Sequence, residues 1–597
     1  MSVQYLDSEK LYYSFVSGAQ EVIKNKKTLN EINVFPVADG DTGSNLSSTM
    51  HAIILDAKIL HTVKATMGTI ADAALNGARG NSGIIIAQYI NGIFMSLLDE
   101  EKINMVSFAE TVKNAVPYAY KAIANPVEGT IITVIKDWAE SIYRNKDKAA
   151  DFQELFSEAM TDASHSLEMT TKQLQVLENS NVVDSGAKGF VHFINGFLDF
   201  LKSGKLGTEL VEADEDFSFN EDLIHSNQEI LHRYCTEALV TGEFINHEAI
   251  KESLSQFGDS LIVAGNDRKA RIHIHTNTPE KIFQVLRTAG VIVQQKADDM
   301  VRQNEDAFER KYDIALVTDS IADVPQEVID RFQVHMVPLS LHFEGTSYLD
   351  KLTMTAEIFY PILDEIAEYP TSSQPNPVVI ESYLRALTDH YKKVIIVTVA
   401  KEQSGTYSVF RKAAEKYAGE GKQVVVIDSK KNSGAEGLLV MKAAELIHSG
   451  KGMEEIVREI ESLREKTNIL VSVNTLKYMV RSGRLGKVSG FAAKALNLKP
   501  VISIDNIGKG KIEKNAFSEK ANMRKIMGML NEVNKKDKIT RYAIVHANDA
   551  SRAEVFSLRC TKLLGKEPEY IMNISTIVGM SAGVGSVAVS YMCEEGK

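Results

Sequence analysis

The spacing of apolar residues changes along this chain, and that change limits the fold more than any other feature. Up to residue 203 the spacing is helical, with Leu46, Met50 and Ile53 on one face of a segment. From Tyr312, five short apolar runs, DIALVTDS, VHMVPLSL, KVIIVTVA, KQVVVIDS and NILVSVN, are separated mostly by amphipathic helical segments. Such alternation is typical of βαβ units around a largely parallel sheet that is buried on both faces.

Local composition divides the chain further. The stretch from Glu209 to Asp222 carries seven acids and no base, which is typical of a solvated linker. The stretch after it mixes short β-type runs with helical ones, and 597 residues are too many for one ordinary domain. We therefore predict a multidomain chain with an all-α domain over 1–203, an acidic linker over 204–227, a small α+β domain over 228–310 and an α/β domain over 311–597.

Charge and cysteine content exclude several classes of protein. Acidic residues outnumber basic ones by 79 to 67, which argues against non-specific binding to nucleic acid or to anionic membranes. Three distant cysteines cannot form a disulfide framework, and no stretch approaches the roughly 20 apolar residues of a membrane span. We expect a cytoplasmic protein that binds no nucleic acid, spans no membrane and forms a homodimer.

Two carboxylates, Asp39 and Asp41, flank Gly40 directly before an apolar helix. Carboxylates at this spacing can converge on one Mg²⁺ ion, which prefers a few carboxylates together with waters and phosphates. Thr42, Ser44 and Asn45 follow, where a helix N-terminus offers free N–H groups to an anion. The same residues are equally consistent with an Asx turn and a helix cap.

Two more glycine-containing polar breaks interrupt this helical domain. The first, GARGNSG, places Arg79, Gly80, Asn81 and Ser82 between two apolar helices, as in a phosphate cradle, although a tight helix–helix turn has the same composition. The second, VVDSGAKG, adds Asp184 and Gly186. Three such breaks in one bundle suggest a single shared site at its end.

These motifs, together with NPVEGTIITVI, resemble in order and distance the nucleotide-binding domain of bacterial fatty acid kinase, a relative of the ATP-binding subunit of dihydroxyacetone kinase. The resemblance implies an eight-helix antiparallel barrel that holds Mg-ATP at one end. It implies Asp39 and Asp41 as Mg²⁺ ligands, and Asn33 lies near a position where the dihydroxyacetone kinase relatives carry another acid. The remaining nucleotide contacts that we expect are Thr42, Ser44, Asn45, Gly80, Asn81, Ser82, Asp184 and Gly186, with Arg79 to counter phosphate charge.

In the middle segment, His273 and His275 alternate in a predicted strand and so project from the same face. With Cys235 they could form a three-ligand zinc site with an open position, although a polar strand face and a buried thiol would look the same. YCTE, GDSLIV and HIHT resemble the middle domain of fatty acid kinase. The resemblance implies that the matching Cys and two His hold a metal ion needed for activity.

The last segment places small polar groups at the carboxyl ends of its predicted strands, where open α/β sheets bind ligands. TDSIADVP, TSSQP, QSGTY, VIDS and LKPVISID resemble the DegV family of fatty-acid-binding proteins. Ser372, Ser373 and Ser404 are the expected carboxylate contacts. The cation of the usual GGR motif is kept as Arg484 in SGR, where we expect it to help neutralise charge during catalysis, whereas Ser581 stands where the family usually has His.

The resemblances together imply a fatty acid kinase fused to its own lipid-presenting domain, with ATP, Mg²⁺ and zinc as cofactors. An acyltransferase that uses acyl phosphates is the expected partner for its product. Two alternatives share part of the sequence evidence. One is a dihydroxyacetone-type kinase of a small polyol, and the other is a lipid-binding regulatory protein that binds ATP without phosphotransfer.

Overall fold

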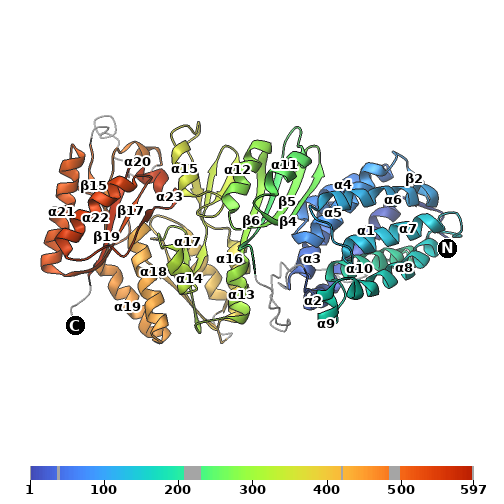
Figure 1. Cartoon of the computed structure of the whole chain (residues 1–597), viewed down its shortest axis with the longest axis horizontal. Helices are drawn as coiled ribbons and strands as arrows, with labels where there is room; N and C mark the ends of the chain where they lie inside the picture. Colours follow the sequence, from blue (N-terminus) through green and yellow to red (C-terminus); the bar gives the residue numbers. More distant parts are fainter. Residues whose placement is uncertain (1, 36–39, 207–229, 418–420, 483–497, 594–597) are drawn as a thin grey trace. The chain divides into compact units, whose positions relative to one another are not determined.

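The computed structural model describes residues 2–35, 40–206, 230–417, 421–482 and 498–593, and its contacts divide the chain into two compact units, Met1–Val301 and Arg302–Lys597. Each unit is drawn in Figure 1, where many of its elements are labelled. No helix among these described residues is long and apolar enough to cross a bilayer.

The first unit begins with a closed ring of eight helices. Each helix contacts the next, and the last contacts the first, so that the apolar faces meet inside the ring. This confirms the predicted helical barrel. Its helices are α1 (Ser8–Lys24), α3 (Thr42–Asp56), α4 (Val63–Gly77), α5 (Gly80–Ser96), α6 (Met105–Ala122), α7 (Ile131–Asn145), α8 (Phe152–Gln173) and α10 (Ser185–Ser203), with the short α2 (Lys26–Glu31), α9 (Gln175–Ser180) and the strands β1 (Tyr5–Asp7) and β2 (Lys102–Asn104) between them.

The second part of this unit is a four-stranded antiparallel sheet in the order β4-β5-β3-β6. Helices α11 and α12 pack on it (Figure 1), which confirms the predicted α+β fold. The strands are β3 (Tyr234–Thr241), β4 (Gly258–Asn266), β5 (Lys269–Thr276) and β6 (Val291–Asp299), and the helices are α11 (His247–Leu254) and α12 (Pro279–Ala289).

The sheet and the helical barrel share one core within the first unit. Ile262 and Ala264 of β4 are buried in the same apolar cluster as the barrel helices. The Asn91 side chain on α5 donates to the carbonyl of Gly265 over 2.9 Å, and the Gly265 N–H donates to Gln88 over 2.8 Å. The sheet is therefore fixed against α5, whose N-terminus carries the GARGNSG motif.

The second unit contains two main sheets with a buried helix between them. One is a parallel sheet in the order β13-β12-β7-β8, and the other is a six-stranded mixed sheet in the order β16-β15-β14-β19-β17-β18. Helix α18 (Ser433–His448) contacts strands of both sheets and is apolar over most of its surface, as expected for a helix with no solvent face. This confirms an α/β fold.

One strand differs in direction from most of the expected sheet. Four of the five strand runs that predicted a parallel sheet do form one, but the fifth, NILVSVN, becomes β14 (Thr467–Ser472), which is antiparallel to both β15 and β19. A buried strand has the same apolar sequence in either direction, so the run did not reveal its orientation.

The bounds of the remaining elements complete the unit. The strands are β7 (Ile314–Asp319), β8 (His335–Val337), β9 (Ser340–Phe343), β10 (Thr346–Leu349), β11 (Thr371–Ser373), β12 (Lys393–Thr398), β13 (Gln423–Asp428), β15 (Val501–Ile504), β16 (Gly510–Lys514), β17 (Ile539–His546), β18 (Ile571–Asn573) and β19 (Val587–Cys593). The helices are α13 (Met300–Phe308), which begins just before the unit boundary, α14 (Gln326–Arg331), α15 (Ala356–Ile362), α16 (Pro377–His390), α17 (Thr406–Ala414), α19 (Met453–Lys466), α20 (Lys477–Arg481), α21 (Glu519–Lys536), α22 (Ala550–Leu564) and α23 (Thr576–Ala582).

Candidate functional site

The N-termini of three barrel helices, α3, α5 and α10, come together at one end of the barrel. A Cβ atom on Gly80 would lie 2.3 Å from the Asn45 side-chain nitrogen, and one on Gly186 would lie 2.4 Å from the Ser82 hydroxyl. Gly80 also has a φ of +56°, which disfavours other residues. The backbone conformation at Gly80 therefore favours glycine, a side chain at Gly186 would displace the Ser82 hydroxyl, and the three polar breaks meet at the end of the barrel as their sequences suggested.

A small cavity of about 40 Å³ lies between these helix N-termini and the middle sheet. Its walls include seven residues that the sequence placed in or near the nucleotide site: Asn33, Asp41, Thr42, Asn45, Gly80, Asn81 and Ser82. Asp41 occupies the N-cap position of α3, but its side chain makes no capping hydrogen bond. This geometry does not match the helix-cap alternative for Asp41 and is compatible with a metal ligand.

Three other expected nucleotide residues have different surroundings. The Ser44 N–H donates to the Asn30 side chain over 3.0 Å, so this group already has a protein partner. Asp184 is buried and caps α10 by accepting from the Ala187 N–H over 2.7 Å, and burial raises the pKa of its carboxyl group to about 6. Neither Asp184 nor Gly186 belongs to the described cavity wall. Asp39 lies outside the described residues.

The middle sheet brings the three predicted metal ligands together. In the antiparallel pairing Cys235 lies opposite His275, and Glu237 lies opposite His273. One ligand atom from each of Cys235, His273 and His275 lies within 4.8 Å of the others. This is the donor set of a three-ligand zinc site.

The surroundings of these side chains also suit a metal ion. His273 Nδ1 lies 3.5 Å from Glu237 Oε1 and His275 Nδ1 lies 3.6 Å from Asp259 Oδ1. Metal-binding histidines are usually oriented by a carboxylate in this way. Burial lowers the pKa of His273, which favours the neutral ring that binds metals. Its Nε2 is buried and has no hydrogen-bond partner within the described part of the chain.

Residues of the candidate phosphate site and of the candidate metal site line the same small cavity. Besides the helix N-termini, its wall contains Cys235, Glu237, His273, His275 and Lys296. The candidate metal site therefore faces the candidate phosphate site, inside the first unit. Sequence reasoning missed Glu237 and Lys296 as members of this site. Glu237 carried a signal, because it alternates with Cys235 along one strand, but Lys296 on β6 carried none.

Arg79 does not line the described cavity. Its guanidinium donates to Glu237 Oε2 over 3.1 Å, and the Gly80 N–H donates to Glu237 Oε1 over 2.7 Å. The anion that contacts the start of α5 in this structure is therefore the carboxylate of Glu237 in the middle sheet. The sequence predicts only a phosphate at this place.

In the second unit, all four predicted substrate residues line one cavity of about 570 Å³. Ser372 and Ser373 come from β11, Ser404 from the loop before α17, and Ser581 from α23. Much of the remaining wall is aliphatic, with side chains such as Ile321, Leu339, Val399, Ile469, Ile502, Val545 and Ile577. Arg484 lies outside the described residues.

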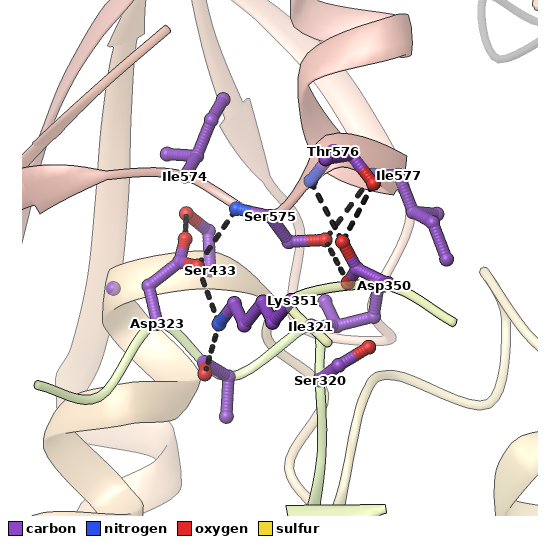
Figure 2. A network of polar contacts seen from close by, with 12 residues as sticks. Ser320, Ile321, Asp323, Asp350, Lys351, Ser433, Ile574, Ser575, Thr576 and Ile577 are labelled. Carbon is purple, nitrogen blue, oxygen red and sulfur yellow. Dashed lines mark hydrogen bonds and ion pairs between the residues drawn. The ribbon is translucent and has the colours of Figure 1, made fainter. Parts of the chain in front are cut away.

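A buried polar network holds part of this cavity wall in place (Figure 2). Asp350 accepts hydrogen bonds from the Thr576 N–H (2.9 Å), the Thr576 hydroxyl (2.6 Å) and the Ser575 hydroxyl (2.7 Å). Asp323 accepts from the Ser575 N–H over 2.9 Å and pairs with Lys351 at 3.0 Å. The network thus fixes the first turn of α23, which continues into Ile577 and Ser581 of the wall.

Comparisons with known proteins agree with this division of the chain. Residues 36–199 match the DAK2 domain, residues 232–307 match the middle domain of FakA-like fatty acid kinase proteins, and residues 313–594 match the DegV family of uncharacterised proteins. The three matches follow in the order that the sequence motifs predicted and confirm the resemblance.

Two curated relatives each match about half of the chain. An uncharacterized protein of Staphylococcus saprophyticus is 32% identical over 321 residues, covering 52% of this chain and 58% of the relative. An uncharacterized protein of Staphylococcus aureus is 33% identical over 306 residues, covering 50% of this chain and 56% of the relative. The chain thus spans little more than half the length of these relatives.

Two solved structures also each match about half of the chain. A fatty-acid-binding DegV family protein of Thermus thermophilus is 28% identical with a TM-score of 0.43, covering 47% of this chain and 99% of that protein. DegV of Bacillus subtilis, described as a fatty-acid-binding protein, is 27% identical with a TM-score of 0.43, covering 48% of this chain and 100% of that protein.

Proposed function

We propose that this chain, which has a DAK2 domain, a fatty-acid-kinase-like middle domain and a DegV-family domain in that order, is an ATP-dependent fatty acid kinase. It transfers the γ-phosphoryl group of ATP to the carboxylate of a fatty acid held by its own last domain. The product is an acyl phosphate.

The cavity of the second unit is the observation that carries this proposal. A space of about 570 Å³ with a largely aliphatic wall and seven serines, four of them predicted from the sequence, suits an acyl chain with a carboxylate head group. Neutral hydroxyls can donate hydrogen bonds to a carboxylate. A small polyol would leave most of this apolar wall without a partner, which disfavours the dihydroxyacetone-type alternative.

The chemistry needs no general base. A fatty acid with a pKa of about 4 to 5 is already ionised at neutral pH. A carboxylate oxygen forms a bond to the γ-phosphorus while the bond from that phosphorus to the β,γ-bridging oxygen breaks, which releases ADP. The enzyme must position two anions and reduce their repulsion.

The first unit contains groups for both tasks. Asp41, together with Asp39, would hold Mg²⁺, which would neutralise phosphate charge when bound. Thr42, Asn45, Asn81 and Ser82 line the same cavity and would orient the phosphates. We propose zinc as the ion of the Cys235, His273 and His275 cluster, because their donor set fits that metal and both histidines are buried.

An acyl phosphate is a reactive mixed anhydride, so a further enzyme must use it promptly. We propose an acyltransferase that accepts acyl phosphates as the partner at this step.

Phosphotransfer can be tested directly with the full chain. Purified protein is incubated with Mg²⁺, γ-labelled ATP and either long-chain fatty acids or small polyols, and the products are identified by ³¹P NMR. We expect label in an acyl phosphate. Label in a polyol phosphate would favour the dihydroxyacetone-type kinase, and ATP and lipid binding without transfer would favour the regulatory protein.

A further inference from the structure

Glu237 lies at the point where the candidate metal site and the helix that bears the glycine loop meet. It is 2% exposed and stands on β3, two residues from Cys235 and on the same face of the strand. Its carboxyl group pairs with two guanidinium groups, that of Arg79 at 3.1 Å and that of the buried Arg271 at 3.0 Å. The side chain is thus a buried carboxylate.

Each oxygen of this carboxylate joins the two parts of the first unit. Oε1 accepts from the Gly80 N–H on α5 (2.7 Å) and lies 3.5 Å from Nδ1 of His273 on β5. Oε2 accepts from Arg79 before α5 (3.1 Å) and from the buried Arg271 on β5 (3.0 Å). Each oxygen of Glu237 therefore contacts one group of the barrel part and one group of the sheet.

Glu237 contacts the chain directly before residues that we expect to bind the nucleotide. Gly80 is the first residue of α5, and Asn81 and Ser82 follow it directly into the cavity wall. A shift of Glu237 would therefore strain or break its hydrogen bonds to Arg79 and Gly80 at the start of α5. His273 is equally constrained, because its Nδ1 faces both Glu237 and the Cys235 sulfur, which is 3.9 Å away.

We propose that Glu237 is a positioning residue that couples metal occupancy at Cys235, His273 and His275 to the binding of Mg-ATP. This inference rests on the proposed function, because it assumes a nucleotide at the start of α5. A bound metal fixes the His273 ring, the ring fixes the Glu237 carboxylate, and the carboxylate holds Arg79 and Gly80 in place. Such coupling is reciprocal, so nucleotide must tighten metal binding by the same factor.

A structural role alone would leave the two sites independent. Glu237 would then stabilise the contact between sheet and barrel, and its loss would lower stability without linking the two affinities. The measurement that separates the two roles is therefore the dissociation constant (Kd) of Mg-ATP in zinc-loaded and zinc-free protein, for the wild type and for Glu237→Gln.

The variant keeps the size of the side chain but replaces one oxygen with an amide that cannot accept from donors. We expect zinc removal to raise the Kd of Mg-ATP by about 5- to 150-fold in the wild type, the usual range of such coupling, and to change it less than twofold in Glu237→Gln. Calorimetry gives each Kd, and circular dichroism checks that all four samples are folded. A wild-type Kd that does not depend on zinc, or full coupling retained in Glu237→Gln, would overturn the inference.

Asp259→Asn is the matched control. Asp259 also lies beside a candidate ligand, 3.6 Å from His275, and it pairs with His232 at 3.5 Å, so both of these contacts stay within the middle domain. We expect this variant to weaken zinc binding by about 10- to 100-fold while retaining the wild-type coupling when zinc is saturating. Loss of coupling in both variants would overturn the specific role of Glu237.

Arg79→Gln covers the case in which Glu237→Gln does not fold. Arg79 is 30% exposed and lies on the barrel side of the bridge, outside the candidate metal site. We expect zinc affinity, measured by chelator competition with nucleotide bound, to fall in this variant, and unchanged zinc affinity would contradict the coupling. If the wild type binds no Mg-ATP at all, the proposed function fails first, and this inference fails with it.

Discussion

Asp41 and Asp184 stand at the same helical position but have different surroundings. Each occupies the N-cap of a barrel helix, α3 and α10 respectively. Asp184 is buried and its carboxylate accepts the Ala187 N–H, as a helix cap does. Asp41 is only partly buried, makes no capping bond and lines the cavity. The surroundings of the two side chains therefore identify Asp184 as a structural residue and Asp41 as a candidate metal ligand.

We expect Asp41→Ala to reduce phosphotransfer to background, because a Mg²⁺ ligand would be lost. Stability should change by less than about 0.5 kcal/mol, since the residue supports neither a cap nor the core. The measurements are turnover with saturating Mg-ATP and the melting temperature of the same sample. Asp184→Ala is the control and should lose about 1 kcal/mol with its cap. Wild-type turnover in Asp41→Ala would remove this residue from the nucleotide site.

Residues of the candidate site differed in how well the sequence could predict them. Cys235, His273 and His275 were predictable because strand alternation puts His273 and His275 on one face, and motif resemblance added the cysteine. Lys296 faces them only because β6 pairs with β3, so that Lys296 lies opposite Glu237. The sequence of neither segment shows that these two distant strands pair with each other. For this reason Lys296 could not be predicted.

At the scale of elements, the cap of α10 should give the barrel a measurable pH dependence. Burial raises the pKa of Asp184 from 3.8 to about 6 in the folded protein. The folded state therefore binds more protons than the unfolded state between about pH 4 and 6. The stabilisation is fully present below pH 4 and is lost as pH rises through 6, by about 3 kcal/mol for a shift of about two units.

Trp138 makes this prediction measurable, because it is the single tryptophan of the chain and is buried in the barrel. We expect urea unfolding followed by Trp138 fluorescence to show the wild type losing stability relative to Asp184→Asn as pH rises from 4 to 6.5. Asparagine can still cap the helix but does not titrate. An identical pH dependence of the two proteins would show that Asp184 keeps an ordinary pKa.

Helix α23 is a second element whose position we expect to affect the protein, here its affinity for a fatty acid. Asp350 is fully buried and anchors Ser575 and Thr576, the cap and first residue of this helix. We expect Asp350→Ala to raise the Kd of a long-chain fatty acid by roughly tenfold, although Asp350 itself does not line the cavity, and to destabilise the unit by about 2 to 4 kcal/mol.

Fluorescence displacement of a labelled fatty acid measures the first effect and thermal melting measures the second. Asp389→Ala, which removes a partly exposed ion pair with Lys422, is the control and should change neither. Normal affinity in a folded Asp350→Ala protein would mean that the network does not position α23 for the ligand.

The elements themselves were largely predictable, whereas their directions were not. Apolar periods of 3.6 and 2 indicated the barrel helices and the buried strands, since they reflect which side chains must leave water. The antiparallel placement of β14 depends on its neighbours β15 and β19, which come from distant parts of the chain. Only the assembled sheet determines the direction of β14.

At the scale of the whole molecule, the contacts give two compact units that meet in sequence at residue 301. Helix α13 crosses this point, but its later residues pack on the second unit. Arg302 donates to the carbonyl of Ile329, and Tyr391 donates to Asp306 over 3.0 Å. The family matches leave the boundary between residues 307 and 313, but a fragment that starts at residue 311 would lack these two contacts, so we would produce the isolated last domain from Met300.

We expect residues 300–597, produced alone, to fold and to co-purify with a long-chain fatty acid, because all the described residues that line the 570 Å³ cavity belong to this unit. The carboxylate should lie near Ser372, Ser373 and Ser404, where neutral hydroxyls can donate to it. Ser581, in place of a charged donor, should make binding weaker than a histidine would, since a hydrogen bond to a charged group contributes about 1.5 to 3 kcal/mol and a neutral one about 1 kcal/mol. Mass spectrometry of solvent extracts identifies the acid, and Ser372→Ala with Ser404→Ala should lower its occupancy. If no acyl chain is found and added fatty acid leaves the melting temperature unchanged, the unit does not present lipid, and the kinase must act on another substrate.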